Sequence, residues 1–461
     1  MRLAAAAVSA LPSGMARHTY DRGSQAIGQV HLGIGAFHRA HQAWYSDRAM
    51  DGGDRDWMIA GVSLRSAGVA QQMNPQDGLY TLAERSAAGT ALRLIGSVRE
   101  VLVASEARAA VVARMAAPQT RIVSFTVTEK GYCRAADGTL DQALAGEGSF
   151  YPLLAEALRL RRDNAAGGLT LLSCDNLADN GRQLERLLSE YLDRADPALR
   201  AWFAAECTCP STMVDRIVPA TTDADRAEIG AALGLRDEAA VVTEPFSQWV
   251  IEDRFAAGRP AWERVGAELV SDVVPYETAK LRMLNGAHSL LAYCGLQRGH
   301  AFVHEAVADP AIRPLVDRLM REEAAPTIAA AQGQDLMAYA DALVARFANP
   351  ALNHRLAQIA MDGSQKIPQR WLATLAANRV RGRASPAILA GLAAWLRHLR
   401  GDNSDACGAV DDPRAAEFAA TWQAAGSSGI AEAVFGNTAQ GDWQLASGER
   451  AAITQALSGP F

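Results

Sequence analysis

Strand-like and helix-like segments alternate through the first 270 residues of this 461-residue chain, and helix-like segments alone follow. Apolar runs typical of buried strands occupy residues 29–32, 57–64, 92–95, 100–103, 121–127 and 169–173. Helical patterns lie between them at residues 36–50, at 105–115 with Ser105 as the expected N-cap, and at 150–162 and 180–194. Such alternation is typical of a parallel, doubly wound sheet, so the sequence predicts an α/β Rossmann-type domain.

The second part of the chain carries helical patterns without a convincing strand between them. These patterns occupy residues 281–293, 314–330, 335–347, 353–359, 368–378, 384–399, 412–425 and 450–457, and the polar residues 401–408 are expected to form a loop. A last strand is expected at 270–274. We therefore expect a dinucleotide-binding domain at 1–274 and a mainly helical domain, which carries substrate and catalytic residues, at 275–461.

Composition excludes several classes of protein. The formal net charge of −6 argues against a nucleic-acid partner, and no apolar stretch reaches the roughly 18 residues that a transmembrane helix needs. Of the six cysteines, only Cys207 and Cys209 are close together, and no second pair completes a zinc site. The cysteines are expected to be reduced thiols of a cytoplasmic protein without a metal. The alanine-rich residues 4–7 are expected to begin a capped surface helix rather than a signal peptide.

The first predicted strand leads into a glycine turn, Gly33-x-Gly35-x-x-His38, that opens a helix. Gly33 permits the tight turn, and Gly35 lets the backbone approach a phosphate, so a pyrophosphate can bind at the helix N-terminus. Because His38 replaces the usual third glycine, a plain strand–turn–helix is the alternative. The place of the motif in the first strand–helix unit favours a dinucleotide site, which would include Ile34 and Phe37.

The second predicted strand ends without the acid that usually binds the adenosine ribose. Leu64 is followed by Arg65 and Ser66. Arg65 could contact a 2′-phosphate, or it could simply be solvated. The expected cofactor is therefore NAD, with NADP as an open alternative.

The segment from Lys280 to His288 groups three polar side chains. On an α-helix, at about 100° per residue, Lys280, Asn285 and His288 fall within one arc of about 140°. A buried amine can exchange a proton with an alcohol, an amide can stabilise an oxyanion, and a histidine can orient a hydroxyl. A surface lysine beside a core histidine is the alternative. Tyr276 and Lys280 also match the Tyr-x-x-x-Lys of short-chain dehydrogenases, but this pair opens the helical domain instead of lying in the nucleotide domain.

Polar residues also follow several strands, and the carboxyl ends of parallel strands line the ligand crevice of a doubly wound sheet. These residues are Thr128-Glu129-Lys130, Cys174-Asp175-Asn176 and Val214-Asp215, and a further polar cluster runs from Asp362 to Arg370 with Gln358 before it. An ordinary loop is the alternative for each. Only three of the 45 basic residues are lysines, namely Lys130, Lys280 and Lys366. Their retention indicates either ammonium chemistry or chance.

With these motifs the chain resembles the polyol-specific long-chain dehydrogenases, a family that includes mannitol 2-dehydrogenase and fructuronate reductase. The matching segments are HLGIGAFHRAHQA, QDGLYTL, TVTEKGY, SCDNLADNG, MVDRIVP, EPFSQWVIED, KLRMLNGAH and MDGSQKIPQR. The resemblance implies a Rossmann-type domain, a helical C-terminal domain and an active site between them. It also implies metal-independent hydride transfer with a lysine as general acid and base.

The resemblance assigns roles residue by residue. It implies that Lys280 is the acid/base and that Asn176 and Asn285 flank the reacting oxygen. Substrate contacts are implied at Val214, Asp215, His288 and Lys366, with Lys130, Gln358 and Arg370 as further candidates. Coenzyme contacts are expected at Gly33, Ile34, Gly35, Phe37, His38, Arg65, Thr128 and Glu129.

Two segments, TVTEKGY and QIAMDGSQK, look more like the hexuronate reductases of this family than like its mannitol enzymes. The favoured reaction is therefore the interconversion of fructuronate and mannonate. Oxidation of mannitol or arabinitol is the alternative, and a catalytically silent nucleotide-binding regulator is a remote one. We expect a small sugar or sugar acid as the partner, no nucleic acid or membrane, and a monomer or small homo-oligomer.

Overall fold

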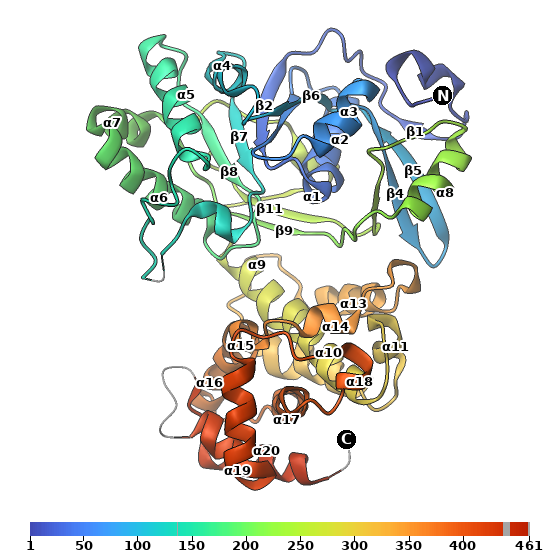
Figure 1. The fold of residues 1–461 in the computed structure, drawn as a ribbon, viewed down its shortest axis with the longest axis vertical. Helices are drawn as coiled ribbons and strands as arrows, with labels where there is room; N and C mark the ends of the chain where they lie inside the picture. The colour runs from blue at the N-terminus through green and yellow to red at the C-terminus, as the bar shows by residue number, and fades with distance from the viewer. Residues whose placement is uncertain (136, 437–442, 460–461) are drawn as a thin grey trace. The chain divides into compact units, whose positions relative to one another are not determined.

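The computed structural model describes residues 1–135, 137–436 and 443–459, and the chain divides into two compact units, Met1–Val273 and Val274–Phe461 (Figure 1). The two units have different architectures, and each is described separately. Among the described residues, no helix has the length and apolar character needed to cross a bilayer.

A five-stranded parallel sheet forms the centre of the N-terminal unit. Its strands run in the order β6-β3-β2-β7-β8. Their bounds are β2 (Ile27–Leu32), β3 (Met58–Ser63), β6 (Val98–Val103), β7 (Ile122–Phe125) and β8 (Thr170–Ser173). The chain builds outward from β2 on one side and then resumes at β7 on the other, so the strand order reverses beside β2. This sheet confirms the predicted Rossmann-type fold.

Helices cover both faces of this sheet. They are α1 (Ala36–Ala40), α2 (Gln42–Asp51), α3 (Gly68–Met73), α4 (Arg108–Ala116), α5 (Tyr151–Asp163), α6 (Asn180–Ala195) and α7 (Pro197–Glu206), whereas α8 (Asp223–Leu233) packs on a smaller sheet. One apolar core joins α4, α5 and α6 to β2 and β7, and another joins α2 to β3 and β8. The expected Ser105 cap is wrong, because the Val103 carbonyl accepts bonds from residues 106 and 107 and this turn delays α4 to Arg108. The expected helix 36–50 is also interrupted, at His41 (φ −118°, ψ −95°).

Two smaller sheets complete this unit. One contains β1 (Ala16–Arg17), β4 (Tyr80–Ser86), β5 (Gly89–Ile95) and β10 (Val241–Thr243), and the other contains β9 (Thr212–Asp215), β11 (Gln248–Glu252) and β12 (Glu268–Val270). The last strand therefore ends at Val270, earlier than the expected 270–274, because α9 begins at Val274. The alanine-rich N-terminus forms a 3₁₀-helix, η1 (Ala5–Ala10), without a side-chain cap.

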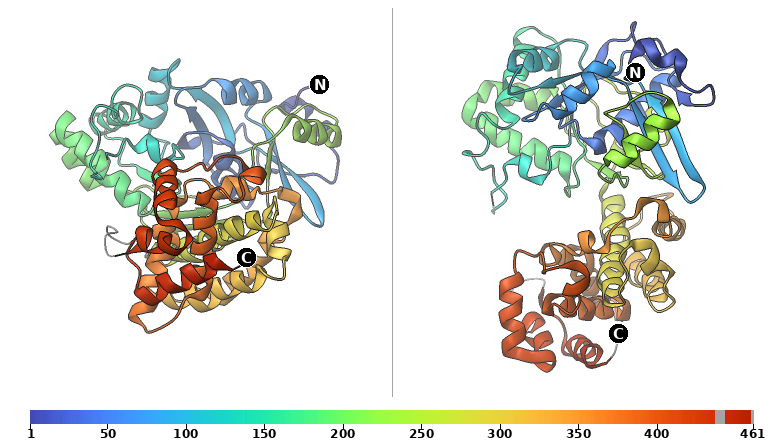
Figure 2. Two further views of the ribbon diagram at one scale, coloured as in Figure 1. Left: turned by 60° about the horizontal axis from the view of Figure 1, so that its bottom comes forward. Right: turned by 45° about the vertical axis from the view of Figure 1, so that its right-hand side comes forward.

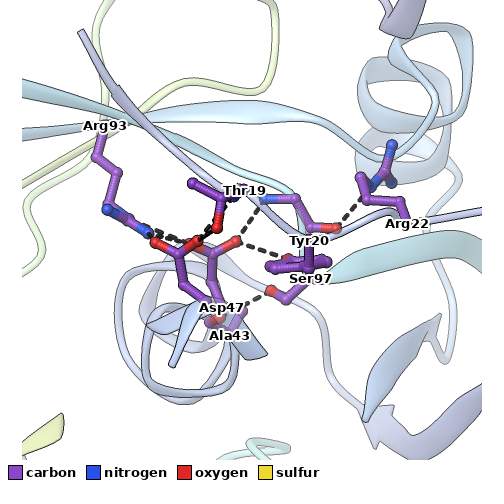
Figure 3. Close-up of polar contacts among 9 residues, drawn as sticks. Thr19, Tyr20, Arg22, Ala43, Asp47, Arg93 and Ser97 are labelled. Atoms are coloured by element: carbon purple, nitrogen blue, oxygen red, sulfur yellow. Dashed lines mark hydrogen bonds and ion pairs between the residues drawn. The ribbon is translucent and has the colours of Figure 1, made fainter. Parts of the chain in front are cut away.

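A buried carboxylate fastens α2 to the β4–β5 hairpin (Figure 3). Asp47 is fully buried and accepts bonds from the Tyr20 hydroxyl (2.8 Å), the Gly96 N–H (2.9 Å) and the Arg93 guanidinium (2.9 Å). Because an unpaired buried charge is costly, these donors hold α2 against β5 and the residue that follows it.

The described part of the C-terminal unit contains helices and no strand, as the sequence predicts. Its elements are α9 (Val274–Ala279), η5 (Lys280–Asn285), α10 (Gly286–Gln297), α11 (Val303–Ala308), α12 (Arg313–Arg318), η6 (Leu319–Ala324), η7 (Ala325–Thr327), α13 (Leu336–Phe347), η8 (Pro350–Leu352), α14 (Leu356–Ala360), α15 (Gly363–Ile367), η9 (Pro368–Leu372), α16 (Ala373–Val380), α17 (Pro386–Arg400), α18 (Ser404–Cys407), α19 (Ala415–Phe435) and α20 (Ser447–Ser458). The buried α10 packs against α14 and α17, and α17 packs against α20. Figure 2 shows this helical unit, coloured from yellow to red, from two further sides.

Several predicted helices of this unit differ from the structure. The segment 314–330 is divided among α12, η6 and η7, and residues 328–330 lie outside any helix. The helix expected to begin at Asn353 begins at Leu356, because Asn353 has a left-handed backbone (φ 45°). The expected loop at 401–408 contains the short α18, and the helix expected at 412–425 continues to Phe435 through a bend at Gly426 (φ 61°).

Candidate active site

The glycine turn after β2 passes directly over β7. Gly33 has a φ of 96°, and a Cβ there would lie 2.2 Å from the Thr126 carbonyl oxygen, so only glycine fits. At Gly35 a Cβ would meet only the Gly33 carbonyl oxygen, at 3.8 Å. The Ile34 side chain is buried against Gly61 on β3. The backbone at Gly35 is therefore open to a group that approaches closely, and a pyrophosphate fits this requirement.

A buried pair of imidazoles supports this turn. His31 and His38 stack with their ring centroids 3.4 Å apart, and both are almost fully buried. The Thr126 hydroxyl donates to the Gly33 carbonyl (2.8 Å), so it accepts from Nε2 of His31 (2.8 Å). Burial lowers the pKa of His31 to about 3 and lowers the pKa of His38 well below its usual value. Both rings are therefore neutral at neutral pH, and the His38 ring packs beneath the turn.

The turn after β7 has a strained backbone. Thr128 has φ 66° and ψ 164°, a conformation that glycine adopts readily and a β-branched residue does not. Such a residue costs roughly 1–3 kcal/mol and persists only where its surroundings enforce it. Thr128, Glu129 and Lys130 are all exposed. The strain therefore marks a functional candidate among exposed residues of the sheet edge.

The parallel sheet brings expected site residues that follow four strands to one edge. Gly35 follows β2, Arg65 follows β3, Thr128 follows β7, and Asn176 follows β8, with the strand ends in register. Arg65 is exposed. Burial raises the pKa of the Cys133 thiol, and the charge of Arg65 is near enough to offset part of that rise. Phe37, in α1, stacks on His41 with centroids 5.1 Å apart.

Val214 and Asp215 are the last residues of β9, and both are buried. They pair with Trp249 and Gln248 of β11. The Thr212 hydroxyl at the start of β9 donates to the Ser173 carbonyl at the end of β8 (2.6 Å). The two expected substrate residues therefore lie on β9, a strand whose start is hydrogen-bonded to the carboxyl end of β8.

In the C-terminal unit, Lys280 and Asn285 lie on a π-helical turn, η5. The expected α-helical spacing of these two residues is wrong, because i to i+5 bonding widens the turn and brings positions five apart closer to the same side. Arg370 Nη1 donates to the Asn285 carbonyl (3.3 Å), and Trp371 Nε1 donates to the Gly286 carbonyl (3.1 Å). Side chains of η9 thus donate hydrogen bonds to backbone carbonyls where η5 meets α10. Side chains inserted in this way disturb the regular backbone hydrogen bonds of an α-helix.

His288 follows on the first turn of α10. Its ring packs on Phe347 (4.8 Å between centroids) and on the edge of His354 (5.3 Å), and its buried Nε2 has no partner among the described residues. Burial lowers the pKa of His288 well below its usual value, and the positive charges of Arg346 and Arg370 lower it further. A neutral, buried imidazole with an unsatisfied nitrogen is suited to bind a substrate hydroxyl.

Two cations lie close to these residues. Arg370 Nη1 also donates to the Ser289 hydroxyl (2.9 Å), and burial lowers the pKa of Arg370 to about 10. The Lys366 ammonium donates to the carbonyls of Ile359 (3.4 Å) and Met361 (2.5 Å). Burial lowers the pKa of Lys366, and the neighbouring Arg370 lowers it further. Since an ammonium has three protons, Lys366 retains one for a further acceptor.

Some features of the site could not be read from the residue pattern. Gln358 is exposed on α14. Ser289 carried no signal, because its role depends on Arg370, 81 residues away. Asp175 lies within the segment SCDNLADNG, but its hydrogen-bond partners, 43 to 48 residues earlier in the chain, are brought to it only by the fold. Within residues 1–135, 137–436 and 443–459, no group of three or more histidine, cysteine, aspartate or glutamate side chains could hold a metal ion.

Comparisons with known proteins match both units. A family model described as the mannitol dehydrogenase Rossmann domain matches residues 27–264, and one described as the mannitol dehydrogenase C-terminal domain matches residues 272–457. The D-mannonate oxidoreductase of Escherichia coli (strain K12) is 44% identical over 421 residues, covering 88% of this chain and 86% of that protein. A mannitol 2-dehydrogenase of Pyricularia oryzae is 37% identical over 449 residues, covering 92% and 89%.

Among solved structures, the mannitol 2-dehydrogenase of Pseudomonas fluorescens, in a ternary complex with NAD and D-mannitol, is similar with a TM-score of 0.84. The sequence identity is 33%, and the match covers 99% of this chain and 96% of that one. The similarity therefore extends over both units.

Proposed function

The chain belongs to the mannitol dehydrogenase family, and we propose that it is an NAD-dependent oxidoreductase that interconverts fructuronate and mannonate. The observation that carries the proposal is the π-helical turn that presents Lys280 and Asn285 on one side, with Arg370 bonded to it. The 44% identity to a D-mannonate oxidoreductase supports the choice of substrate.

The two units divide the work in this proposal. Residues 1–274 bind the coenzyme, and residues 275–461 supply the acid/base and most of the substrate contacts. The coenzyme residues are Gly33, Ile34, Gly35, Phe37, His38, Arg65, Thr128 and Glu129. The open backbone at Gly35 supports this assignment, since a pyrophosphate can bind there at close range. These residues would hold the coenzyme, which would supply the hydride chemistry: as NAD⁺ it would take up a hydride from the alcohol carbon, and as NADH it would return one to the carbonyl carbon.

Lys280 performs the proton transfer. In oxidation the neutral amine removes the hydroxyl proton, and in reduction the ammonium returns it. The amide groups of Asn176 and Asn285 donate hydrogen bonds to the developing alkoxide, where preorganised donors have the largest effect. The neutral His288 orients the substrate hydroxyl through its unsatisfied Nε2. Because a lysine can transfer the proton unaided, we expect activity to survive exhaustive EDTA treatment.

A carboxylate on the substrate would have cationic side chains available near the proposed catalytic residues. Lys366 and Arg370 are both partly buried, and a charge-assisted bond in such surroundings is stronger than one in water. Lys130 is a further candidate, and Val214, Asp215 and Gln358 complete the proposed substrate contacts. Oxidation of a neutral polyol is the second candidate, supported by the similarity to a mannitol 2-dehydrogenase.

The test follows absorbance at 340 nm with fructuronate and NADH, and separately with mannitol, arabinitol and NAD. We expect rapid turnover of fructuronate and slow or absent turnover of the polyols. Preference for a polyol would move the assignment to the second candidate. Tight nucleotide binding without turnover of any hexose derivative would indicate a silent regulator. Repeating the assay with NADPH tests whether Arg65 binds the 2′-phosphate of that coenzyme.

We also propose a cytoplasmic enzyme, since all six cysteines are free thiols, as suits a reducing compartment. A monomer or small homo-oligomer is the expected state, with neither nucleic acid nor membrane as a partner. Size-exclusion chromatography with light scattering measures the oligomeric state directly.

A further inference from the structure

The carboxylate of Asp175 holds three donors of the strained turn after β7. Its Oδ1 accepts from the Thr128 N–H (2.8 Å), and its Oδ2 accepts from the Val127 N–H (3.0 Å) and the Tyr132 hydroxyl (2.9 Å). Asp175 itself is only 8% exposed. Burial raises the pKa of this carboxyl, while the three donors act in the opposite direction by favouring its charged form.

These bonds explain how Thr128 keeps an unfavourable backbone. A strained residue persists only where its surroundings over-determine it, and here the Thr128 N–H is bound to a charged, nearly buried acceptor. The acceptor is itself fixed, because Tyr132 also bonds the Ser173 hydroxyl (2.5 Å) beneath it. The carboxylate therefore selects the conformation of the turn that leads into Glu129.

The main chain of Asp175 is fixed from the other side. The buried amide of Asn180 donates to the Asp175 carbonyl (3.0 Å) and to the Thr212 carbonyl (2.9 Å), and it accepts from the Thr212 N–H (2.9 Å). Asn176 follows directly in sequence. One residue thus joins the turn after β7 to the first residues after β8, at the edge where the sheet presents its polar ends.

We propose that Asp175 is a positioning residue, which holds Thr128 in its strained conformation and thereby fixes the coenzyme-facing turn together with Asn176. The inference rests on the proposed function, because it takes Thr128 and Glu129 as coenzyme contacts. It adds a physical reason why a non-glycine residue can occupy position 128. If the Asp175 carboxylate matters because Thr128 is strained, then replacing Thr128 with glycine, which removes the strain, should compensate for the loss of the carboxylate.

The test measures the dissociation constant of NADH by fluorescence titration without substrate, so its result does not depend on which sugar the enzyme uses. Asp175→Asn replaces one acceptor oxygen with an NH₂ that faces another donor, and we expect NADH binding to weaken about tenfold or more. Because Thr128 is itself a proposed coenzyme contact, Thr128→Gly alone serves as the background in which the effect of Asp175→Asn is measured a second time. In the double variant, glycine adopts the turn unaided, so at least a third of the lost affinity (on a logarithmic scale) should return.

The chain offers a matched control in Asp237, another nearly buried carboxylate that accepts from two backbone N–H groups and one side chain. Its partners are the Thr81 N–H (2.6 Å), the Ala239 N–H (2.9 Å) and Gln76 Nε2 (2.8 Å). Asp237→Asn should lower thermal stability and leave the NADH constant within twofold. Weakening by Asp237→Asn equal to that by Asp175→Asn would overturn the proposal, as would an absence of recovery in the double variant.

Tyr132→Phe provides a milder variant in case Asp175→Asn fails to fold. It removes one of the three donors and leaves the carboxylate, so NADH binding should weaken about threefold and recover with Thr128→Gly. An unchanged dissociation constant of NADH in Tyr132→Phe would show that the Asp175 carboxylate and its donors do not control the coenzyme site. If all variants behave as expected but fructuronate is not turned over, the positioning role stands and only the proposed substrate falls.

Discussion

Lys280 and Asn285 are the first and last residues of a single π-helical turn. In an α-helix, residues five apart point in clearly different directions, whereas the wider π-helical turn brings them closer to the same side. An amine that transfers a proton and an amide that binds an oxyanion need to reach one oxygen, and this turn presents both from one side. π-Helical turns are rare and frequently occur at functional sites, which agrees with the role proposed here.

The first prediction concerns the acid/base. Lys280→Met should lower turnover about 10²–10⁴-fold, because it removes the group that moves the proton, while NADH binding stays nearly unchanged. Lys280→Arg is the matched variant, since a guanidinium keeps the charge but does not give up its proton. Both should be equally slow at saturating substrate. Substantial activity in Lys280→Arg would mean that the residue supplies charge and not proton transfer.

The second prediction concerns the two asparagines. Loss of one preorganised donor to an oxyanion typically lowers turnover about 10²–10³-fold, so Asn176→Ala and Asn285→Ala should each show such a loss. If both amides bind the same oxygen, the double variant should lose less than the product of the single losses. Single-turnover rates of hydride transfer measure this directly. Fully multiplicative losses would contradict a shared oxygen.

The Rossmann-type sheet was predictable because buried parallel strands have a strong local signature, as at residues 121–127, and Gly33 marks the turn that the first strand requires. Boundaries were less predictable. The break at His41 and the late start of α4 depend on turns that local periodicity does not reveal. The hairpin strand β4 was missed, since its pairing with β5 is a property of the fold and not of its residues.

The candidate site was predictable as a set of residues and not as a geometry. Lys280, Asn285 and His288 were identified by residue type and spacing, but the spacing assumed an α-helix. The end of the π-helical turn is hydrogen-bonded by Arg370 and Trp371, which reach carbonyls 85 residues earlier in the chain. The residue periodicity of one segment cannot reveal contacts with residues so far away in the chain. Likewise, Asp175 is visible in the sequence, but the strain at Thr128 that gives it a role is a backbone property.

The third prediction concerns pH and stability. His31 has a pKa of about 3 in the folded protein, against about 6.5 when unfolded. Below pH 6.5 the unfolded chain binds a proton that the folded chain does not, so His31 lowers the free energy of unfolding by about 1.4 kcal/mol for each pH unit between 6.5 and 3. The effect is absent above pH 6.5.

Urea unfolding of the wild type and His31→Gln at several pH values tests this. The variant should be less stable at pH 7.5, because it loses the ring stacking on His38. The difference should then shrink as the pH falls from 6.5 to 5, since glutamine does not titrate. Parallel stability profiles for the two proteins would show that His31 titrates normally in the fold.

The last prediction concerns the charge of the substrate. Lys366 donates to two carbonyls and keeps a third proton for another acceptor, in a partly buried place where a charge-assisted bond contributes about 1.5–3 kcal/mol. Fructuronate and fructose differ at the terminal carbon, so the enzyme should prefer fructuronate about tenfold or more in kcat/KM, which corresponds to about 1.4 kcal/mol. Lys366→Met should reduce this preference mainly by lowering kcat/KM for fructuronate, leaving kcat/KM for fructose almost unchanged.

Lys130→Met is the control from the same small set of lysines, and it separates the two candidates. The variant that reduces the preference for fructuronate identifies the lysine that binds the carboxylate. Arg370 is unsuitable for this purpose, because its removal would also release the Asn285 carbonyl and so disturb the catalytic turn. Equal efficiency for the two sugars in the wild type would instead indicate that Lys366 binds neutral hydroxyls, as a polyol dehydrogenase would require.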